Sequence, residues 1–390
     1  MIERVIGFAG AGFSCAVVAR ELVTRGPFKA VIYDERTHVA GNCHTSRDSE
    51  TGIMVHHYGP HIFHTSNEHV WNYVQRWGRF ENFSHQVKAS TAKGIFHLPI
   101  NLRTLNEFFG KKMSPSEAEK FVQSLGDRSI GEPKNFEEQA LKMLGRELYD
   151  NFFYGYTKKQ WGVEPRQLSA SILKRLPIRF TEDLSYFNDP FQGIPRAGYT
   201  AIVENILDHP KIEVRLGERL TREGVKNFEH VFYSGPLDGY FSYQLGKLNY
   251  RTVTFEEHRA DGDFQNHSVV NYCEERIPYT RIAEHKHFAP WEKFDRTVYF
   301  KEFSKQTEDG DTPFYPMRLD PDKKLLQDYI KLAEQETAVT FLGRLGTYRY
   351  LDMHVVIEEA LKLAEVCLNE SDIKRWPHFS TSPLSSGAGG

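Results

Sequence analysis

The chain has 390 residues, of which 40% are hydrophobic and 26% are charged. A chain of this length and ordinary composition is expected to fold into two or three globular domains. Its net charge of −3 gives no electrostatic reason to expect nucleic acid or an anionic membrane surface as a partner. No apolar run approaches the roughly 20 residues that span a bilayer, and no signal peptide is recognised, so we expect no membrane insertion.

The cysteines also bear on the compartment. Cys15, Cys43, Cys273 and Cys367 show no metal-ligand spacing and are too few for a disulfide scaffold. Reduced thiols in a cytoplasmic protein are the economical interpretation.

The N-terminal segment carries the most informative pattern. A short apolar run over 5–9 leads into Gly10 and Gly12, and a helix-like segment follows from residue 16. A second strand is predicted over 31–33, with Asp34 at its carboxyl end. In a strand–turn–helix unit the first glycine permits a tight turn, the second lets a pyrophosphate approach the backbone, and the carboxylate accepts from a ribose hydroxyl. The pattern favours a dinucleotide site over a chance turn.

Four histidines fall within nine residues of the next distinctive segment, at His56, His57, His61 and His64. A metal site is one interpretation, but no carboxylate or thiolate stands at ligand spacing, and a Gly-Pro pair interrupts any helix. A loop pressed against a cofactor ring and a solvated turn are the alternatives. We favour the cofactor loop because of the family resemblance given below.

A mostly helical region is predicted from Asn101 to about Gly162. Ser114 begins a capping box with proline at the first helical position, and Asn135 caps a further helix. The end of this region, 151–162, is densely aromatic. Such runs are more often core than binding platform, but tyrosines, a tryptophan and two lysines at a helix end could also stack a planar base. The residues alone leave these two interpretations equally weighted.

Short strands alternate with loops from about 167 to 340. The segments 212–216, 230–233 and 268–272 suggest a mixed or antiparallel sheet. Helices are then predicted around 321–336 and 354–369. Between them, a strand with a glycine turn at 339–344 would return the chain to the first domain. The Ser/Gly-rich tail 380–390 is expected to be disordered.

Three arginines stand in loop-like contexts among prolines, glycines and tyrosines: Arg175, Arg281 and Arg344. A single arginine is usually a surface charge. In such loops, however, the planar fork of guanidinium donors is a good candidate for holding phosphate groups.

Several of these stretches together resemble a known family. Residues 58–65, 155–162, 171–177, 232–238, 278–281 and 343–353 occur in the order found in bacterial-type UDP-galactopyranose mutases. The resemblance covers roughly residues 3–370. These enzymes are flavoproteins that interconvert UDP-galactopyranose and UDP-galactofuranose.

The resemblance implies an α/β fold with three discontinuous domains. The Rossmann-like FAD-binding domain would comprise 1–80, about 205–240 and 338–370, and the helical domain about 101–166. The domain built on an antiparallel or mixed sheet would comprise about 81–100, 167–204 and 241–337. A homodimer is also expected by resemblance.

The resemblance also assigns candidate residues. FAD would contact Gly12, Phe13, Ser14, Asp34, Gly41, Asn42, His61, Arg344, Leu351, Asp352 and Met353. The catalytic candidates are Arg175 and Arg281, which would grip the diphosphate, and His61 and His64 beside the isoalloxazine ring. Substrate would contact Phe152, Phe153, Tyr156, Thr157, Trp161, Tyr186, Asn271, Tyr315 and Tyr350. Two positions depart from the family pattern: Cys15 replaces the usual third glycine, and Ala40 precedes Gly41 where a glycine is common.

The chemistry implied by the resemblance is covalent catalysis by the cofactor. N5 of the reduced flavin attacks the anomeric carbon of the sugar and displaces UDP, so an external reductant must supply electrons. The ring opens and recloses through another hydroxyl. An FAD-dependent oxidase or dehydrogenase, and a mutase acting on UDP-N-acetylgalactosamine, remain as alternatives.

Overall fold

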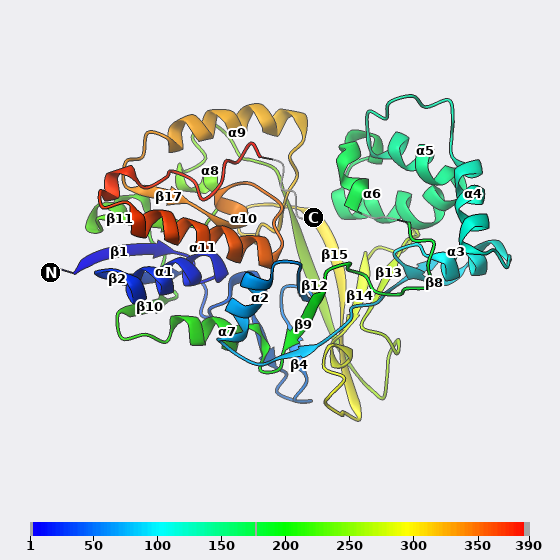
Figure 1. Ribbon diagram of the computed structural model, residues 1–390, viewed down its shortest axis with the longest axis horizontal. Helices are drawn as coiled ribbons and strands as arrows, with labels where there is room; N and C mark the ends of the chain where they lie inside the picture. The colour runs from blue at the N-terminus through cyan, green and yellow to red at the C-terminus, as the bar shows by residue number, and fades with distance from the viewer. Residues whose placement is uncertain (1–2, 176–177, 386–390) are drawn as a thin grey trace.

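The computed structural model describes residues 3–175 and 178–385 and places two larger sheets side by side (Figure 1). The first is parallel and has five strands. Its strand order is β10 (Ile212–Leu216), β2 (Phe28–Asp34), β1 (Arg4–Ala9), β11 (His230–Tyr233) and β17 (Val339–Phe341). Because β2 and β11 flank β1 on opposite sides, the carboxyl ends of β1 and β11 form the switch point where such folds bind ligands.

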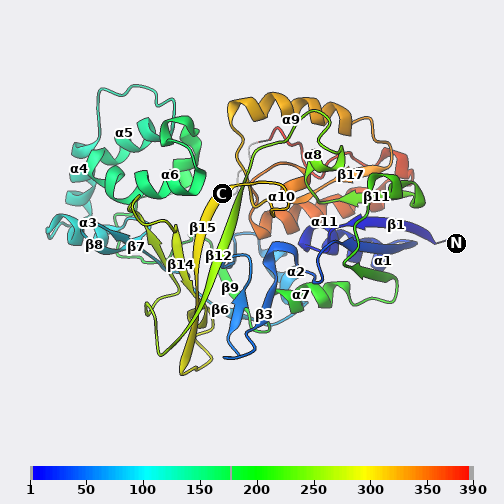
Figure 2. The ribbon, with the colours of Figure 1, turned by 180° about the vertical axis from the view of Figure 1, so that it is seen from behind.

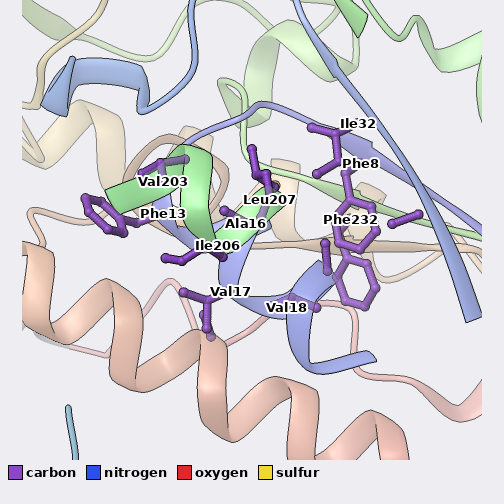
Figure 3. Close-up of a cluster of buried hydrophobic side chains, with 14 of the residues drawn as sticks. Phe8, Phe13, Ala16, Val17, Val18, Ile32, Val203, Ile206, Leu207 and Phe232 are labelled. Carbon is purple, nitrogen blue, oxygen red and sulfur yellow. The ribbon is translucent and has the colours of Figure 1, made fainter. Parts of the chain in front are cut away.

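Helices cover both faces of this sheet. One face packs on α1 (Phe13–Arg25), α7 (Gly198–Leu207), α11 (Met353–Asn369) and α2 (Glu68–Gln75). In that core Phe8 stacks on Phe232 with ring centroids 5.1 Å apart, and Val17 and Ile206 complete the packing (Figure 3). The other face packs on α8 (Leu237–Tyr240) and α9 (Asp320–Ala333). Successive side chains of β11 enter the two cores alternately, as the pleat of a strand requires.

The second sheet is mixed and has seven strands. Their order is β16 (Tyr315–Pro316), β12 (Tyr250–Asp261), β15 (Arg296–Gln306), β14 (Arg281–Glu284), β13 (Val269–Tyr272), β7 (Val87–Thr91) and β8 (Gly94–Leu98). Smaller sheets pair β3 (Thr45–Arg47) with β4 (Met54–His56), and β9 (Phe191–Pro195) with β5 (Phe63–Thr65) and β6 (Phe80–Asn82). Seen from behind, the long strands β12 and β15 run between the parallel-sheet lobe and the helical lobe (Figure 2).

The helical lobe follows β8. It contains α3 (Leu102–Phe109), α4 (Pro115–Leu125), α5 (Phe136–Leu148), a π-helical segment (Tyr149–Tyr154) and α6 (Gly155–Trp161). The predicted caps are confirmed: Ser114 and Glu117 form a capping box, and the Asn135 side chain accepts from the backbone N–H of Glu138. Short 3₁₀ turns and one further helical turn, α10, occupy Gly41–Cys43, Pro165–Gln167, Ala170–Arg175, Arg222–Asn227, His285–Phe288, Gly343–Gly346 and Ile373–Arg375.

Two expectations about strands and one about the tail need correction. The strands at 212–216 and 230–233 are not part of a mixed or antiparallel sheet, because both pair in parallel as β10 and β11. Only the third, β13, joins the mixed sheet. The tail residues 380–385 are described and not disordered: the backbone N–H of Ser380 donates to Phe341 O at 2.9 Å. Residues 386–390 lie outside the described part.

The packing suggests a different division of the chain at two places. Helix α9 shares a core with β11 and β17, although 241–337 was expected in the sheet domain. Helix α7 shares a core with α1, although 167–204 was expected there too. We propose that both helices belong to the nucleotide-binding domain. Within the described residues, no helix combines the length and the apolar character needed to cross a lipid bilayer.

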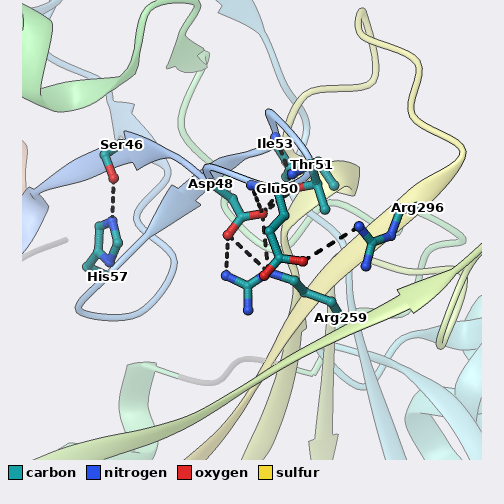
Figure 4. Close-up of polar contacts among 8 residues, drawn as sticks. All are labelled: Ser46, Asp48, Glu50, Thr51, Ile53, His57, Arg259 and Arg296. Carbon is teal, nitrogen blue, oxygen red and sulfur yellow. Dashed lines mark hydrogen bonds and ion pairs between the residues drawn. The ribbon is translucent and has the colours of Figure 1, made fainter.

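A buried ion pair joins the β3–β4 hairpin to the mixed sheet (Figure 4). The Arg259 guanidinium donates to both carboxylate oxygens of Asp48, whose side chain is only 6% exposed. The backbone N–H and the hydroxyl of Thr51 donate to the same carboxylate at 2.9 and 2.8 Å. Hydrogen bonding from Arg259 holds the pKa of Asp48 well below its usual range.

We predict that Asp48→Asn lowers the free energy of unfolding by about 1.5–3 kcal/mol at pH 7, because a charge-assisted pair is lost. Since the folded-state pKa is depressed, the carboxylate stabilises fully above the unfolded pKa of about 4, and this contribution is lost as the pH falls below it. Denaturant unfolding from pH 7 to pH 3 should therefore show the variant and wild type converging. Glu50→Gln is the matched control: its side chain is 55% exposed and lies 3.4 Å from the same arginine. Equal losses in both variants would contradict the assignment.

Candidate functional site

A single cavity of about 560 Å³ joins the carboxyl edge of the parallel sheet to the mixed sheet. Its lining contains residues from both sheets, from the loops after β1 and β2, and from helix α6. The candidate residues that it brings together are Gly12, Phe13, Ser14, Asp34, Gly41, Asn42, His61, His64, Tyr156, Tyr186, Asn271, Arg281, Tyr315, Arg344, Tyr350, Leu351, Asp352 and Met353. Segments far apart in the sequence therefore build one site.

The glycine turn lies at one end of the cavity. Gly10 has φ +111° and packs against Ser234, so a side chain there would clash with the Ser234 hydroxyl. Gly12 begins helix α1, and a Cβ added to it would meet no atom within 4 Å. Asp34 supports this turn, because its Oδ2 accepts from the backbone N–H of Ala11 at 2.8 Å. Backbone amides at a helix N-terminus beside free space form a cradle for a pyrophosphate.

The loop after β2 completes the same end. The backbone N–H of Ala40 donates to Ala11 O at 2.9 Å, which ties this loop to the glycine turn. Ala40 itself has φ +73°, the left-handed conformation in which glycine is favoured. Arg36 donates through Nη2 to the side-chain oxygen of Asn42 at 2.9 Å. Its Nη1 is buried without a hydrogen-bond partner among the described residues, as expected if an anion occupies the cavity here.

Cys15 is accommodated without opening the turn. The side chain is fully buried where α1 packs on β1, and its Sγ lies 3.7 Å from Ala9 O. Burial raises the pKa of the thiol to about 12, so it stays protonated. Cys43, Cys273 and Cys367 are free thiols as well.

Arg344 shapes the opposite wall of the dinucleotide end. Its Nε and Nη2 donate to Leu351 O at 3.2 and 2.6 Å, and its Nη1 donates to Phe314 O at 3.3 Å. The guanidinium lies 5.0 Å from the centre of the Tyr350 ring. Asp352 follows as the N-cap of α11, so the positive end of this helix points into the cavity.

The four histidines of 56–64 have separate partners. His57 bonds to Ser46 at 2.6 Å (Figure 4), and His56 faces His285 with ring centroids 6.0 Å apart. His61 and His64 line the cavity. Burial lowers the pKa of His61 to about 4, which keeps its ring neutral. Among the described residues these histidines do not form a group that could hold a metal ion, and the placement of two of them in the cavity lining is compatible with the cofactor-loop interpretation.

His64 is held on two sides. Its Nδ1 lies 2.6 Å from an oxygen of Asp189, and its ring stacks on Phe187 with centroids 3.7 Å apart. Neither partner was singled out from the sequence. Both belong to the irregular segment before β9. Without a helical or strand pattern of apolar residues there, the sequence does not indicate which side chains face the interior.

The opposite end of the cavity centres on Arg281. The Arg281 Nε donates to Glu302 Oε2 at 2.7 Å, and the Glu302 side chain is only 3% exposed. The charge of Glu302 and nearby tyrosine hydroxyls hold the pKa of Arg281 well above its ordinary value despite burial. Asn271 lies directly opposite Arg281 on the neighbouring strand, and its buried Oδ1 has no partner among the described residues.

Tyrosines surround this guanidinium. Tyr156, Tyr186, Tyr315 and Tyr350 all line the cavity, and the rings of Tyr315 and Tyr350 stack with centroids 5.4 Å apart. Burial raises the pKa of Tyr156, Tyr186 and Tyr315, so these hydroxyls remain neutral donors. A permanent cation among phenols is suited to an anionic ligand that carries many hydroxyl groups.

Four candidate residues whose side chains are described do not line the cavity. Phe152 is packed in the helical core, with ring centroids 5.7 Å from Phe96 and 5.2 Å from Phe108, and Phe153 and Thr157 are also buried. Trp161 packs partly against the same core. Arg175 ends a 3₁₀ turn, and its side chain lies outside the described part.

Fold and site together define a dinucleotide-binding α/β protein with a second binding region for a phosphorylated, hydroxyl-rich ligand. Comparison with known proteins gives the family. A family model described as UDP-galactopyranose mutase matches residues 151–350, and one described as an NAD(P)-binding Rossmann-like domain matches 9–77. The chain belongs to the UDP-galactopyranose mutase family and is a mutase, that is, an isomerase.

Relatives cover almost the whole chain. It is 51% identical to the probable UDP-galactopyranose mutase of Klebsiella pneumoniae, over 95% of this chain and 96% of that protein. It is 47% identical to the dTDP-fucopyranose mutase of Escherichia coli, over 93% of this chain and 98% of the relative. A crystal structure of reduced UDP-galactopyranose mutase superposes with a TM-score of 0.74 at 15% identity, covering 96% of each chain, which supports the fold.

We predict that Gly12→Val abolishes dinucleotide binding without unfolding the protein. The backbone at Gly12 has φ −84° and ψ 178°, which any residue adopts, and the added side chain would enter the space beside the helix N-terminus. Bound flavin after purification, read from the absorbance near 450 nm, should fall to background while the melting temperature of the flavin-free protein is unchanged. Gly131→Val is the control, because a Cβ there also meets no atom within 4 Å. Full flavin content in Gly12→Val would remove the glycine turn from the binding site.

Proposed function

We propose that this mutase interconverts UDP-galactopyranose and UDP-galactofuranose and binds FAD, in its reduced form, along the dinucleotide end of the cavity. The observation that carries the proposal is the continuity of the cavity. It places the glycine turn and the unpartnered Nη1 of Arg36 at one end and the largely buried Arg281 with Asn271 at the other. Substrate and cofactor can therefore share one continuous cavity. The protein is proposed to act in the cytoplasm as a homodimer, with an external reductant supplying electrons.

The dinucleotide end would hold FAD through the chain's own groups. The amides after Gly12 and the Arg36 guanidinium would meet the pyrophosphate, and the N-terminus of α11 would face the ring system. Reduced FAD supplies a nucleophilic nitrogen for the anomeric carbon of the sugar. His61, kept neutral by burial, and His64, held by Asp189 and Phe187, would lie beside the ring system as polar partners.

The other end would hold the nucleotide sugar. Arg281 would bind the diphosphate, where negative charge grows as the anomeric bond breaks, so its contact strengthens in the transition state. Arg175 is proposed as a second diphosphate ligand. The hydroxyls of Tyr156, Tyr186, Tyr315 and Tyr350 would bind the sugar and the phosphates and exclude water, so that UDP is retained until the sugar recloses.

A related substrate is the second candidate. The relative from Escherichia coli is named as a dTDP-fucopyranose mutase and is nearly as similar as the relative named for UDP-galactopyranose. The two substrates differ at the nucleobase, the pentose 2′ position and the sugar C6 position. UDP-N-acetylgalactosamine is the third candidate substrate. An FAD-dependent oxidase would use the same fold for a different reaction, the oxidation of its substrate.

The test is incubation of dithionite-reduced protein with the furanose forms of UDP-galactose, UDP-N-acetylgalactosamine and dTDP-fucose in parallel, with chromatographic separation of the products. We expect UDP-galactopyranose from UDP-galactofuranose, with turnover at least tenfold more efficient than for the others, and none without reduction. Preferential conversion of dTDP-fucofuranose to its pyranose form would transfer the assignment to that substrate. Hydrogen peroxide formation with an oxidisable substrate, and no interconversion of ring forms, would favour the oxidase.

We predict that Arg281→Ala lowers kcat/KM by at least 10- to 100-fold. Loss of one charge-assisted hydrogen bond to the diphosphate is worth about 1.5–3 kcal/mol. Arg276→Ala is the matched control: it lies in the preceding loop, is 79% exposed and pairs with Glu274 on the surface. Steady-state kinetics with the reduced enzyme distinguish the two variants. Unchanged kinetics in Arg281→Ala would show that this arginine does not bind the diphosphate.

A further inference from the structure

Lys159 lies on helix α6 in an environment unlike that of a surface lysine. Four backbone carbonyl oxygens lie within hydrogen-bond distance of its ammonium nitrogen and share its three N–H donors: those of Tyr272 at 2.7 Å and of Glu274, Ile277 and Tyr279 at 2.9 Å each. Burial lowers the pKa of Lys159 to about 8, which shows that its charge is held partly away from water. All four carbonyls belong to one short stretch of the mixed-sheet domain.

That stretch is the hairpin loop between β13 and β14. Strand β13 ends at Tyr272, and strand β14 begins at Arg281. Asn271 and Arg281 are directly opposite one another in the register of these strands, and both line the cavity. The loop that closes around the ammonium is therefore the connection between two proposed diphosphate- and sugar-binding residues.

A second cation, the Arg251 guanidinium, binds the C-terminal end of helix α6. Arg251 of β12, whose side chain is buried, donates from Nε to Gln160 O at 3.0 Å and from Nη2 to Lys159 O at 3.2 Å. Gly162 follows with φ +67°, and a Cβ there would meet Arg251 Nη1 at 2.3 Å, so only glycine lets the guanidinium reach the helix end. A guanidinium on the last carbonyls complements the negative end of the helix.

These contacts join two parts of the site that would bind different parts of one ligand. Helix α6 carries Tyr156, which lines the cavity, and Trp161, which belongs to the aromatic segment that could stack a planar base. The hairpin carries Arg281. We propose that Lys159, supported by Arg251, is a positioning residue that fixes the separation of the base-binding and diphosphate-binding parts, so that one nucleoside diphosphate engages both. This inference rests on the proposed function.

The neighbouring Lys158 provides a matched control. It contacts the same hairpin, but through an ion pair with the exposed carboxylate of Glu275, and it also pairs with Glu164. Exposed pairs of this kind contribute little, because both ions stay hydrated and the contact is screened by salt. The two lysines therefore differ in what they bind: Lys159 binds the backbone carbonyls of the β13–β14 loop, and Lys158 binds carboxylate side chains.

The experiment compares UDP with its two halves by isothermal titration calorimetry on the purified flavoprotein. Uridine probes the base-binding part alone and inorganic pyrophosphate probes the diphosphate-binding part alone. In Lys159→Met we expect the affinity for UDP to fall by about tenfold or more, because the two halves are no longer held at the matching separation. The affinities for uridine and pyrophosphate should change by less than about twofold. Lys158→Met should leave all three affinities unchanged.

Several results would overturn the inference. Equal losses for uridine and UDP in Lys159→Met would show that Lys159 only supports the base-binding helix, and wild-type affinity for UDP would show that it positions nothing. If circular dichroism shows that Lys159→Met does not fold, Lys159→Gln replaces it, because glutamine keeps two N–H donors. We expect Lys159→Gln to show a smaller loss of affinity, restricted to UDP. Wild-type affinity for UDP in Lys159→Gln would also overturn the inference. Wild-type protein that does not bind UDP would overturn the proposed function and this inference together.

Discussion

The site depends on the burial of one positive charge beside one negative charge. The Arg281 guanidinium stays charged at any physiological pH, and Glu302 offsets the cost of its partial burial, while the buried Glu302 carboxylate would be costly without the arginine. Because the bond uses the Arg281 Nε, the terminal nitrogens are left, among the described residues, to meet an anion. The partner thus fixes the guanidinium plane without consuming its outward donors. An anion that enters the cavity therefore meets a cation that is already oriented and largely withdrawn from water.

The position of this ion pair follows from how the chain is threaded. Parallel strands need long crossover connections, and here the connection between β11 and β17 contains most of the mixed sheet. The chain therefore enters the mixed sheet from the carboxyl edge of the parallel sheet, after β11, and returns through α9 to the start of β17. Because an open α/β sheet binds its ligand at the carboxyl edge, this connection brings the second binding region next to the first.

The elements with strong local signals could be predicted from the sequence, and those defined by distant pairing could not. The glycine turn and the caps at Ser114 and Asn135 are local, and the structure shows each as expected. Asp34 stands at the predicted end of β2, where its carboxylate accepts from the backbone N–H of Ala11, and its contact with a ribose hydroxyl stays a prediction. Strand β10 was misassigned because an edge strand is half-exposed and alternates like an antiparallel one. Lys159 and Asp189 gave no signal, because their partners are backbone carbonyls and a histidine more than 100 positions away.

The aromatic segment 151–162 shows why its two interpretations could not be separated in advance. In a regular α-helix Phe152 and Tyr156 stand four positions apart and share one face. The structure has a π-helical segment over Tyr149–Tyr154, which inserts a wider turn before α6 begins. Phe152 is packed in the helical core, whereas Tyr156 packs against the same core and also lines the cavity. Core packing and cavity lining are therefore combined within one segment and even within one side chain, and for that reason aromatic composition and spacing could not separate the two interpretations.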